Sequence, residues 1–360
     1  MNSMKIKHQG ISAITNIFSS ANLREIGKIF MLCLLTSALS ISYALCTNRL
    51  SLVPRSTELS GGKIAAYRAL EKPVGFTNPG NCCFIITALQ LLFMNEHVCN
   101  YLLSVPTSRN KTLVTQILRE VLLKRNARNG NIGNEILQIY NALQKDSINQ
   151  ASGIPPNDMC LFYMDLYNRI INESSAKLAD QERFALQHHL QFSLRQKLID
   201  KEKKFISYVY KTEGIIVTDI PNTPSNLEPL ANNYFAPCER TEYTTYSDFN
   251  GNELPDYLTI YTPLTSNYFG LTFNDTINLN KLPYEIIGIG ARNGASCNSG
   301  HFRTYCKDNQ NWYHINDANV KKIETPAEWE KEKKLQLFGN IAPNEKKLSR
   351  ACMFILKRLK

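Results

Sequence analysis

The chain contains no pair of cysteines in a Cys-x-x-Cys arrangement, although it has ten cysteines in 360 residues. Tetrahedral zinc sites usually take two such closely spaced ligand pairs, so the sequence offers no conventional zinc site. The irregular cysteine spacing and the chain length also argue against the disulfide framework of a small secreted domain. We therefore interpret most of the cysteines as reduced, buried hydrophobic residues.

Internal repeats and low-complexity tracts are also absent. The formal net charge of +10, from 41 Lys+Arg and 31 Asp+Glu, is spread over short clusters. No cluster is interleaved with aromatic residues in the manner of a nucleic-acid groove, so we expect no nucleic-acid partner. With 43% hydrophobic and 20% charged residues, the composition is that of a globular protein that buries a substantial core.

A run of uncharged residues at positions 29–48 stands out near the N-terminus. A helix of this length spans about 30 Å, which matches the hydrocarbon core of a bilayer. Basic residues precede the run, as in signal peptides and signal anchors. Residues 29–47 are therefore predicted to be a signal peptide or a transmembrane anchor, between a polar tail at 1–28 and a linker at 48–72. A buried core helix is the alternative.

Two hydrophobic patterns follow each other from Pro73 onward. Apolar residues at helical spacing predict helices at 83–94, 113–124, 135–143, 158–171 and 182–199. After about residue 205, short runs rich in Ile, Val, Tyr and Thr alternate with Asn/Gly/Pro turns and predict strands. Helices followed by strands indicate an α+β protein with an antiparallel sheet.

A reactive thiol is predicted at residue 83. Residues 75–84 read GFTNPGNCCF, a turn that leads directly into an apolar helix whose first residue is Cys83. Free N–H groups and the positive end of the helix dipole stabilise a thiolate at that position. Asn78 is placed to donate an amide hydrogen to a developing oxyanion. The alternative is a helix-capping turn with two buried cysteines.

Residues 284–320 supply a matching base. A Gly/Ser/Asn loop ends at Gly300, His301 opens the strand that follows, and the next strand ends in Asn316 and Asp317. A thiol protease needs an imidazole beside the cysteine and a side-chain carbonyl or carboxylate that orients the ring. His301 with Asn316 or Asp317 provides both. We predict surface or packing positions for the other histidines after residue 73, which are His97, His188, His189 and His314.

Together these segments resemble the ubiquitin-specific protease (USP) family of papain-type cysteine proteases. Residues 75–84 match the family's Cys box, G-L-x-N-x-G-N-T-C-Y, and Leu89-Gln90 follow it. Residues 300–302 and 312–317 match its His box, G-H-Y followed by W-x-x-F-[D/N]-D. Three further boxes agree in order, at 156–162, 254–258 and 351–356, so the resemblance covers residues 73–358.

The resemblance implies a role for each matched position. The catalytic positions would be the nucleophile Cys83, the general base His301, the third triad member Asn316, its assistant Asp317 and the oxyanion-hole residue Asn78. Cys82 falls where the family usually has Thr. The substrate-binding positions would be Asp158, Gly300 and Phe302. No metal or other cofactor is implied.

The implied fold is α+β and papain-like, of USP type, preceded by the N-terminal hydrophobic helix. It would have a helical thumb at about 73–204, and an antiparallel-sheet palm with short fingers at about 205–358. The fingers lack the Cys-x-x-Cys pairs that often bind zinc in the family. Arg292 replaces a His that commonly precedes the second loop over the active site.

The implied function is that of a thiol-dependent deubiquitinase, which hydrolyses the (iso)peptide bond after the C-terminal glycine of ubiquitin or a ubiquitin-like modifier. The expected partners are that modifier with its conjugates and, through residues 29–47, a membrane. A membrane-anchored or secreted location suits a bacterial effector acting in a host cell or a eukaryotic organelle-membrane enzyme. Two alternatives remain: a membrane-tethered, catalytically weak ubiquitin-binding module, and a protease for another ubiquitin-like protein.

Overall fold

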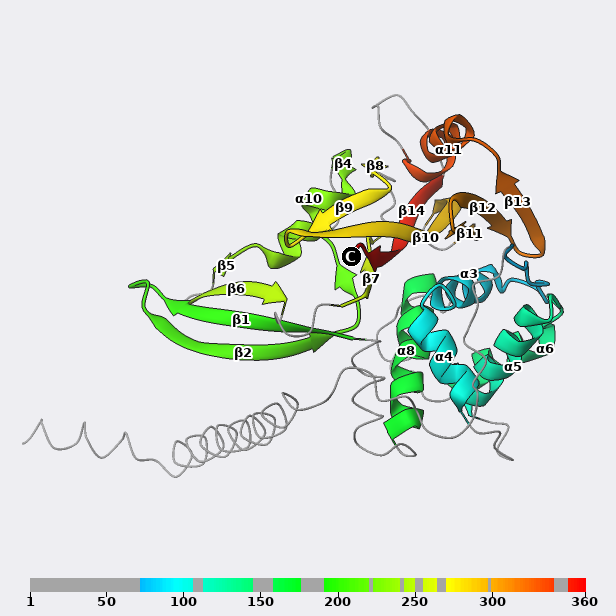
Figure 1. The fold of residues 1–360 in the computed structure, drawn as a ribbon, viewed down its shortest axis with the longest axis horizontal. Helices are drawn as coiled ribbons and strands as arrows, with labels where there is room; N and C mark the ends of the chain where they lie inside the picture. The colour runs from blue at the N-terminus through cyan, green and yellow to red at the C-terminus, as the bar shows by residue number, and fades with distance from the viewer. Residues whose placement is uncertain are drawn as a thin grey trace, which may run out of the picture. The chain divides into compact units, whose positions relative to one another are not determined.

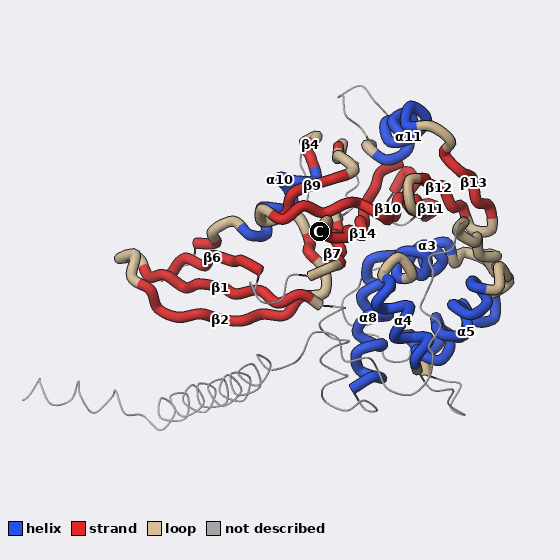
Figure 2. Tube along the Cα trace, viewed as in Figure 1, coloured by secondary structure: helices blue, strands red, loops and turns tan. Residues whose placement is uncertain are grey.

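The longer helices of the described residues precede the strands, as the hydrophobic periodicity predicts, and only short helices lie among the strands (Figures 1 and 2). The computed structural model describes residues 72–105, 113–144, 158–175, 191–219, 223–239, 243–249, 255–263, 270–296, 299–339 and 349–360. All of these belong to one of the two units into which the chain divides, Ile64–Lys360.

The predicted membrane or signal segment lies outside the described residues, together with the tail at 1–28 and the linker up to residue 71. Among the residues that are described, no helix is both long and apolar enough to cross a membrane. The predicted N-terminal hydrophobic helix therefore stays a prediction.

The helical part, the thumb, is built around a central helix. Its helices are α3 (Cys83–Leu92), α4 (Glu96–Ser104), α5 (Val114–Asn126), α6 (Gly133–Gln144) and α8 (Met159–Ser175). Four of the predicted helices are thereby confirmed, with ends that differ by a few residues. Every residue of α3 is buried, because a helix that is apolar on all sides is stable only inside a core. It packs against α8 on one side and a strand of the palm on the other.

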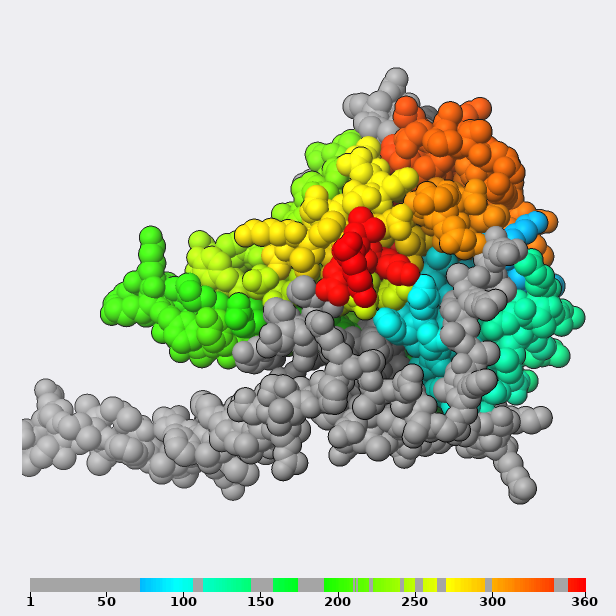
Figure 3. Space-filling view, in the orientation of Figure 1, coloured from blue at the N-terminus to red at the C-terminus, as the bar shows by residue number. Residues whose placement is uncertain are grey.

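The fingers are a separate antiparallel sheet that extends away from the thumb (Figures 1 and 3). Its strand order is β2 (Phe205–Glu213), β1 (Phe192–Asp200), β6 (Tyr243–Phe249) and β5 (Cys238–Glu239).

The helix predicted over residues 182–199 is wrong for its second half, because Phe192–Asp200 is strand β1. The spacing of Leu194, Leu198 and Ile199 also fits one face of a helix. Phe192 and Leu194, however, are both buried with a less buried residue between them, which is the period of a strand. Pairing with β2 and β6 decides the outcome. The strand-rich part of the chain begins at Phe192 rather than near residue 205.

The palm is a larger sheet whose neighbouring strands are antiparallel except for β3 and β7. The path runs through β13 (Asn319–Ile323), β12 (Asn311–Asn316), β11 (Ser299–Asp308), β10 (Leu282–Ser296), β14 (Ser349–Arg358), β7 (Tyr257–Tyr261) and β3 (Ile216–Val217), with β9 (Thr276–Leu279) beside β10. The strand runs predicted after residue 205 are confirmed by these elements and by β2.

Both faces of the palm are covered. Ile287 and Ile355 pack into the core shared with the thumb helices, whereas Ile286 and Leu356 pack into a second core on the opposite face. Each fully buried side chain of this size contributes about 1.5–3 kcal/mol. Packing on both faces of the palm holds α3 against β11.

The smaller elements are β4 (Ser225–Asn226), α10 (Leu227–Asn232), the 3₁₀ turn η1 (Asn233–Phe235), β8 (Leu271–Thr272), α11 (Pro326–Glu332) and the π-helical turn η2 (Lys333–Leu337).

Candidate active site

Cys83 is the first residue of α3, behind a tight turn. The side-chain oxygen of Asn78 accepts hydrogen bonds from the backbone N–H groups of Gly80 (2.9 Å) and Cys82 (3.1 Å). Gly80 and Asn81 have φ angles of 124° and 51°, which glycine and asparagine adopt most readily. The turn ends where α3 begins, so the first N–H groups of the helix have no partner within it. The Cys83 side chain lies at this end of the helix, with the residue 9% exposed.

The segment before the turn is held between two loops from distant parts of the chain. The Phe76 N–H donates to the Asp317 carbonyl oxygen, and the Thr77 N–H donates to the Gly130 carbonyl oxygen, both at 2.9 Å. A Cβ atom on Gly75 would lie 2.3 Å from the Ala318 carbonyl oxygen, which explains the glycine at this position. Sequence reasoning missed the part played by Gly130, because nothing local marks a contact across more than fifty residues.

His301 lies on β11 and contacts both Asn316 and Cys83. Its Nε2 is 2.5 Å from the side-chain oxygen of Asn316 on the neighbouring strand β12. This contact leaves Nδ1 as the ring nitrogen that faces the thiol. The structure therefore brings together the three residues that the sequence assigned to a triad, from an α-helix and two strands.

The charge of the His301 ring depends on Cys83. The hydrogen bond with the Cys83 side chain, followed by that with Asn316, raises the His301 pKa from 6.5 to about 9, although burial acts in the opposite direction. A ring with this pKa is protonated at neutral pH. Such a ring beside a cysteine favours a thiolate–imidazolium pair, which is the reactive state of a thiol protease.

Asp317 contacts Asn78 rather than His301. Its Oδ2 accepts a hydrogen bond from the Asn78 amide at 3.0 Å, while its Oδ1 is buried without a hydrogen-bond partner. The φ angle of 51° at Asp317 belongs to the tight turn between β12 and β13. The structure thus places Asn316 against the histidine ring and Asp317 against the predicted oxyanion-hole residue.

The three predicted substrate-binding residues have different surroundings. Asp158 caps α8, with Oδ1 accepting from the N–H groups of Cys160 (2.8 Å) and Leu161 (3.0 Å). Gly300 is exposed beside the backbone of β10, where a Cβ atom would lie 2.7 Å from the Asn293 carbonyl oxygen. Phe302 is buried in the core shared with the thumb, so the structure gives it a packing role.

Arg292 and the other described histidines have partners outside this centre. The buried guanidinium of Arg292 lies over the Phe302 ring, 5.6 Å from its centroid. His97 lies 3.5 Å from a carboxylate oxygen of Asp256, and His314 stacks on Tyr305 with ring centroids 4.7 Å apart. His188 and His189 lie outside the described residues.

Within the part of the chain that the structure describes, no group of three His, Cys, Asp or Glu side chains has the arrangement to hold a metal ion. The fingers carry one described cysteine, Cys238, which is exposed.

The fold is similar to chains from solved structures of a deubiquitinating (DUB) module. One is the SAGA Ubp8/Sgf11/Sus1/Sgf73 DUB module bound to ubiquitin aldehyde, with a TM-score of 0.61 and 15% identity over 81% of this chain and 71% of that chain. Another is the same module bound to monoubiquitin, with a TM-score of 0.61 and 16% identity over 89% and 75%. A third, the yeast SAGA module with an Sgf73 mutant, has a TM-score of 0.58 and 14% identity over 81% and 70%. At these identities the likeness concerns the fold.

Sequence comparisons bear on the family directly. No curated protein matches the chain. The family model described as ubiquitin carboxyl-terminal hydrolase matches residues 74–353, which include the Cys83 turn, β11 and β12. The match covers most of the chain and confirms the resemblance seen in the Cys and His boxes. The chain belongs to the ubiquitin carboxyl-terminal hydrolase family.

Proposed function

We propose that this protein is a thiol-dependent deubiquitinase, which hydrolyses the (iso)peptide bond after the C-terminal glycine of ubiquitin or a ubiquitin-like modifier. The observation that carries the proposal is the hydrogen-bonded series of Cys83, His301 and Asn316, assembled from the thumb and the palm. Membership of the family supports it, as does the ubiquitin bound to structurally similar modules.

The first chemical step is acylation of Cys83. The thiolate attacks the carbonyl carbon of the terminal glycine, and negative charge develops on the carbonyl oxygen. The Cys83 N–H, at the start of α3, and the second amide hydrogen of Asn78 stabilise that charge. Because Asp317 fixes the Asn78 amide, the donor is oriented before the substrate arrives. The His301 imidazolium then gives its proton to the leaving lysine amine, and the C–N bond breaks.

The second step releases the modifier. Neutral His301 takes a proton from a water molecule, which attacks the thioester carbonyl. The C–S bond breaks, the thiolate–imidazolium pair is restored, and the modifier leaves as a carboxylic acid that loses its proton to solvent. Asn316 keeps the ring oriented through both steps, because its side-chain oxygen holds Nε2 and leaves Nδ1 toward the sulfur.

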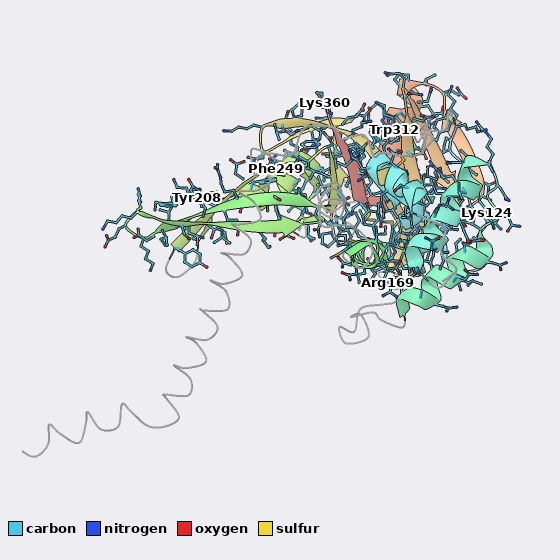
Figure 4. All side chains as sticks on the ribbon, turned by 60° about the horizontal axis from the view of Figure 1, so that its bottom comes forward. Lys124, Arg169, Tyr208, Phe249, Trp312 and Lys360 are labelled. Carbon is cyan, nitrogen blue, oxygen red and sulfur yellow. The ribbon has the colours of Figure 1, made fainter. Side chains whose placement is uncertain are left out.

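We assign the body of the modifier to the exposed face of the fingers. Tyr208 and Tyr246 both pair with Lys197 of the middle strand, so the three side chains share a face. The two tyrosines are 47% and 43% exposed. The opposite face buries Leu194 and Phe249 in the core on the palm face away from the thumb, so the tyrosine face is the face that does not enter this core. Figure 4 shows Tyr208 on the fingers and Phe249 closer to the palm.

The proposal is tested with the full chain and a fluorogenic ubiquitin C-terminal amide. Cys83→Ala is expected to remove activity, and His301→Ala to lower kcat/KM by roughly two to four orders of magnitude, the usual contribution of a general acid–base. Cys82→Thr is the matched control and keeps activity. An active Cys83→Ala variant would overturn the assignment.

A covalent ubiquitin probe separates the alternatives. Capture through Cys83 is expected for a deubiquitinase. Binding of ubiquitin without capture would identify a catalytically weak binding module, and capture of a different probe in a panel would identify another ubiquitin-like modifier.

Membrane attachment through residues 29–47 is a separate proposal that rests on the sequence. Fractionation of the expressed full chain with N-terminal sequencing tests it. Recovery of the intact chain in the membrane fraction supports an anchor, whereas a new N-terminus just after the uncharged run supports a cleaved signal. An intact chain in the soluble fraction would contradict both.

A further inference from the structure

Two neighbouring thiols stand at the start of α3, and the proposed mechanism uses one of them. Cys82 and Cys83 are 8% and 9% exposed. The Cα atoms of adjacent residues are about 3.8 Å apart, so the two side chains leave the backbone beside each other. Cys82 Sγ donates to the Gly80 carbonyl oxygen at 3.0 Å, a bond that a hydroxyl group would make equally well. A second thiol at this place is therefore unexplained by the turn or by the hydrolysis.

We propose that Cys82 and Cys83 are a peroxide-responsive pair, in which Cys82 captures the oxidised nucleophile as a reversible disulfide. The inference rests on the proposed function in taking Cys83 as the reactive thiolate.

The chemistry needs hydrogen peroxide as oxidant and a small thiol as reductant. The Cys83 thiolate attacks one peroxide oxygen, the O–O bond breaks, and a sulfenic acid and hydroxide form. Cys82 sulfur then attacks the sulfenic sulfur, and the hydroxyl group leaves with the Cys82 proton as water. Overall, two thiols and one peroxide give one disulfide and two waters. Two molecules of the small thiol restore both cysteines and are themselves joined in a disulfide.

The two sulfurs differ in their surroundings, which sets the order of events. Cys83 lies at the start of α3 and is hydrogen-bonded to His301, the setting of a reactive cysteine, so it reacts first. Burial, and then the nearby charges of Cys83 and Asp317, raise the pKa of the Cys82 thiol above its usual value. Conversion of the Cys83 thiolate into a neutral sulfenic acid removes one of those charges. Cys82 therefore becomes a better nucleophile once its neighbour has been oxidised.

The turn before Cys82 has room for the change. Cys82 is the N-cap residue, with φ −105° and ψ 16°, and its N–H is bonded to the Asn78 side chain rather than to the helix. A Cβ atom at Gly80 would meet nothing within 4 Å, so the turn borders open space.

A disulfide between neighbours is strained and easily reduced. Its Cα separation of about 3.8 Å is below the usual range of about 4.4–6.8 Å. The strain makes the bond more reducible than an ordinary disulfide. Such a bond can protect the Cys83 sulfur reversibly, because a sulfur in a disulfide is not oxidised further to the irreversible sulfinic acid.

The test compares the wild-type full chain with Cys82→Thr, Cys82→Ser and the control Cys238→Ser, which removes an exposed thiol elsewhere. Each protein is treated with hydrogen peroxide, and half of each sample is then reduced with dithiothreitol. For the wild type and Cys238→Ser, we expect the peptide with both active-site cysteines to be lighter by two hydrogens, and activity to return after reduction. In both Cys82 variants we expect added oxygen on Cys83. The activity that returns after reduction should be at least roughly fivefold lower than in the wild type.

The peptide masses decide the proposal without reference to activity. Equal recovery in the wild type and both Cys82 variants, or oxidised wild type without the bond between the two cysteines, would overturn it. Both replacements keep a hydroxyl donor to the Gly80 carbonyl oxygen but differ in size, so concordant results in the two variants argue against a folding defect as their cause. If no protein reacted with a ubiquitin probe before oxidation, the proposed function would be wrong. The peptide masses would still show whether Cys82 and Cys83 form a disulfide.

Discussion

Asn78 and Asp317 are 239 positions apart in the chain, yet the Asn78 amide donates a 3.0 Å hydrogen bond to the Asp317 carboxylate. The neighbouring residue, Asn316, instead holds the His301 ring. Two adjacent residues in one turn therefore orient two different catalytic groups: Asn316 the base, and Asp317 the predicted oxyanion donor. Loss of either residue is expected to affect a different step of the reaction.

Removal of the Asp317 carboxylate is expected to release Asn78. Asp317→Ala should lower kcat by roughly 10- to 100-fold with little change in KM, because a loosened oxyanion donor acts mainly in the transition state. Asp317→Asn keeps an acceptor for the Asn78 amide and should lose much less. Steady-state kinetics on a ubiquitin amide measures both, and equal losses in the two variants would contradict this role.

The protonation of His301 is expected to depend on the cysteine. In Cys83→Ala the largest cause of the raised pKa is gone, so the pKa of His301 should fall from about 9 toward its usual value of 6.5. NMR titration of the ring carbon and proton shifts measures the change. For the intact enzyme, kcat should decline as the pH rises through about 9, because the imidazolium that protonates the leaving amine is lost. A ring that still titrates near 9 without the thiol would point to another cause.

His314 is expected to make the fold sensitive to acid. Burial, followed by the charge of Arg303, lowers its pKa from 6.5 to about 4 despite the nearby Glu332 carboxylate. The unfolded chain therefore binds this proton more readily than the folded protein does. Stability should be fully present above pH 6.5 and decline as the pH falls to about 4, by on the order of 3 kcal/mol.

The control for this titration is His314→Phe, which keeps the stacking on Tyr305 without a titrating group. Chemical denaturation at pH 7, 5.5 and 4 should show a flatter pH dependence in the variant. Parallel curves for the two proteins would exclude His314 as the source.

Gly75 is expected to be intolerant of any side chain. In Gly75→Ala the new Cβ would meet the Ala318 carbonyl oxygen at 2.3 Å, so the segment must move away from the turn that carries Asp317. Overpacking of this kind costs about 1–3 kcal/mol, and activity should fall as well. Gly133→Ala is the matched control, because its Cβ would meet its nearest neighbour at an ordinary 3.5 Å. Thermal melts and kinetics compare the stability and activity of the two variants. Equal values for both would show that the segment adapts to a side chain at Gly75.

The tyrosine face of the fingers is expected to contribute to KM. Tyr208→Ser removes an exposed aromatic ring that contacts Phe205 and Arg195. KM for a ubiquitin substrate should rise roughly three- to tenfold at unchanged kcat, as for loss of a moderate interface contact. Val209→Ser is the control, because the next residue along β2 points to the other face and is 43% exposed. A similar KM change in both variants would argue against a specific contact.

Local sequence patterns predicted most of the elements correctly. The helix that begins at Cys83 and the strand that begins near His301 are marked by nearby turn residues and by apolar runs. The prediction of a helix up to Ile199 was wrong because the spacing of its apolar residues fits both a helix and a strand. Only pairing with distant strands selects the strand. The burial of Phe302 in the thumb core likewise depends on helices far away in the chain.

The amino-acid sequence by itself determined the residue types at the site and their local geometry: a cysteine at the start of a helix, a histidine after a loop, and an Asn-Asp pair at a strand end. Turn chemistry and helix dipoles act over a few residues, so they can be read locally. Only the tertiary structure decided that Asp317 orients Asn78, that Gly75 and Gly130 position the Cys83 turn, and that the contacts of His301 raise its pKa. These outcomes depend on contacts and burial between segments more than fifty residues apart, where packing of the whole sheet against α3 sets the distances.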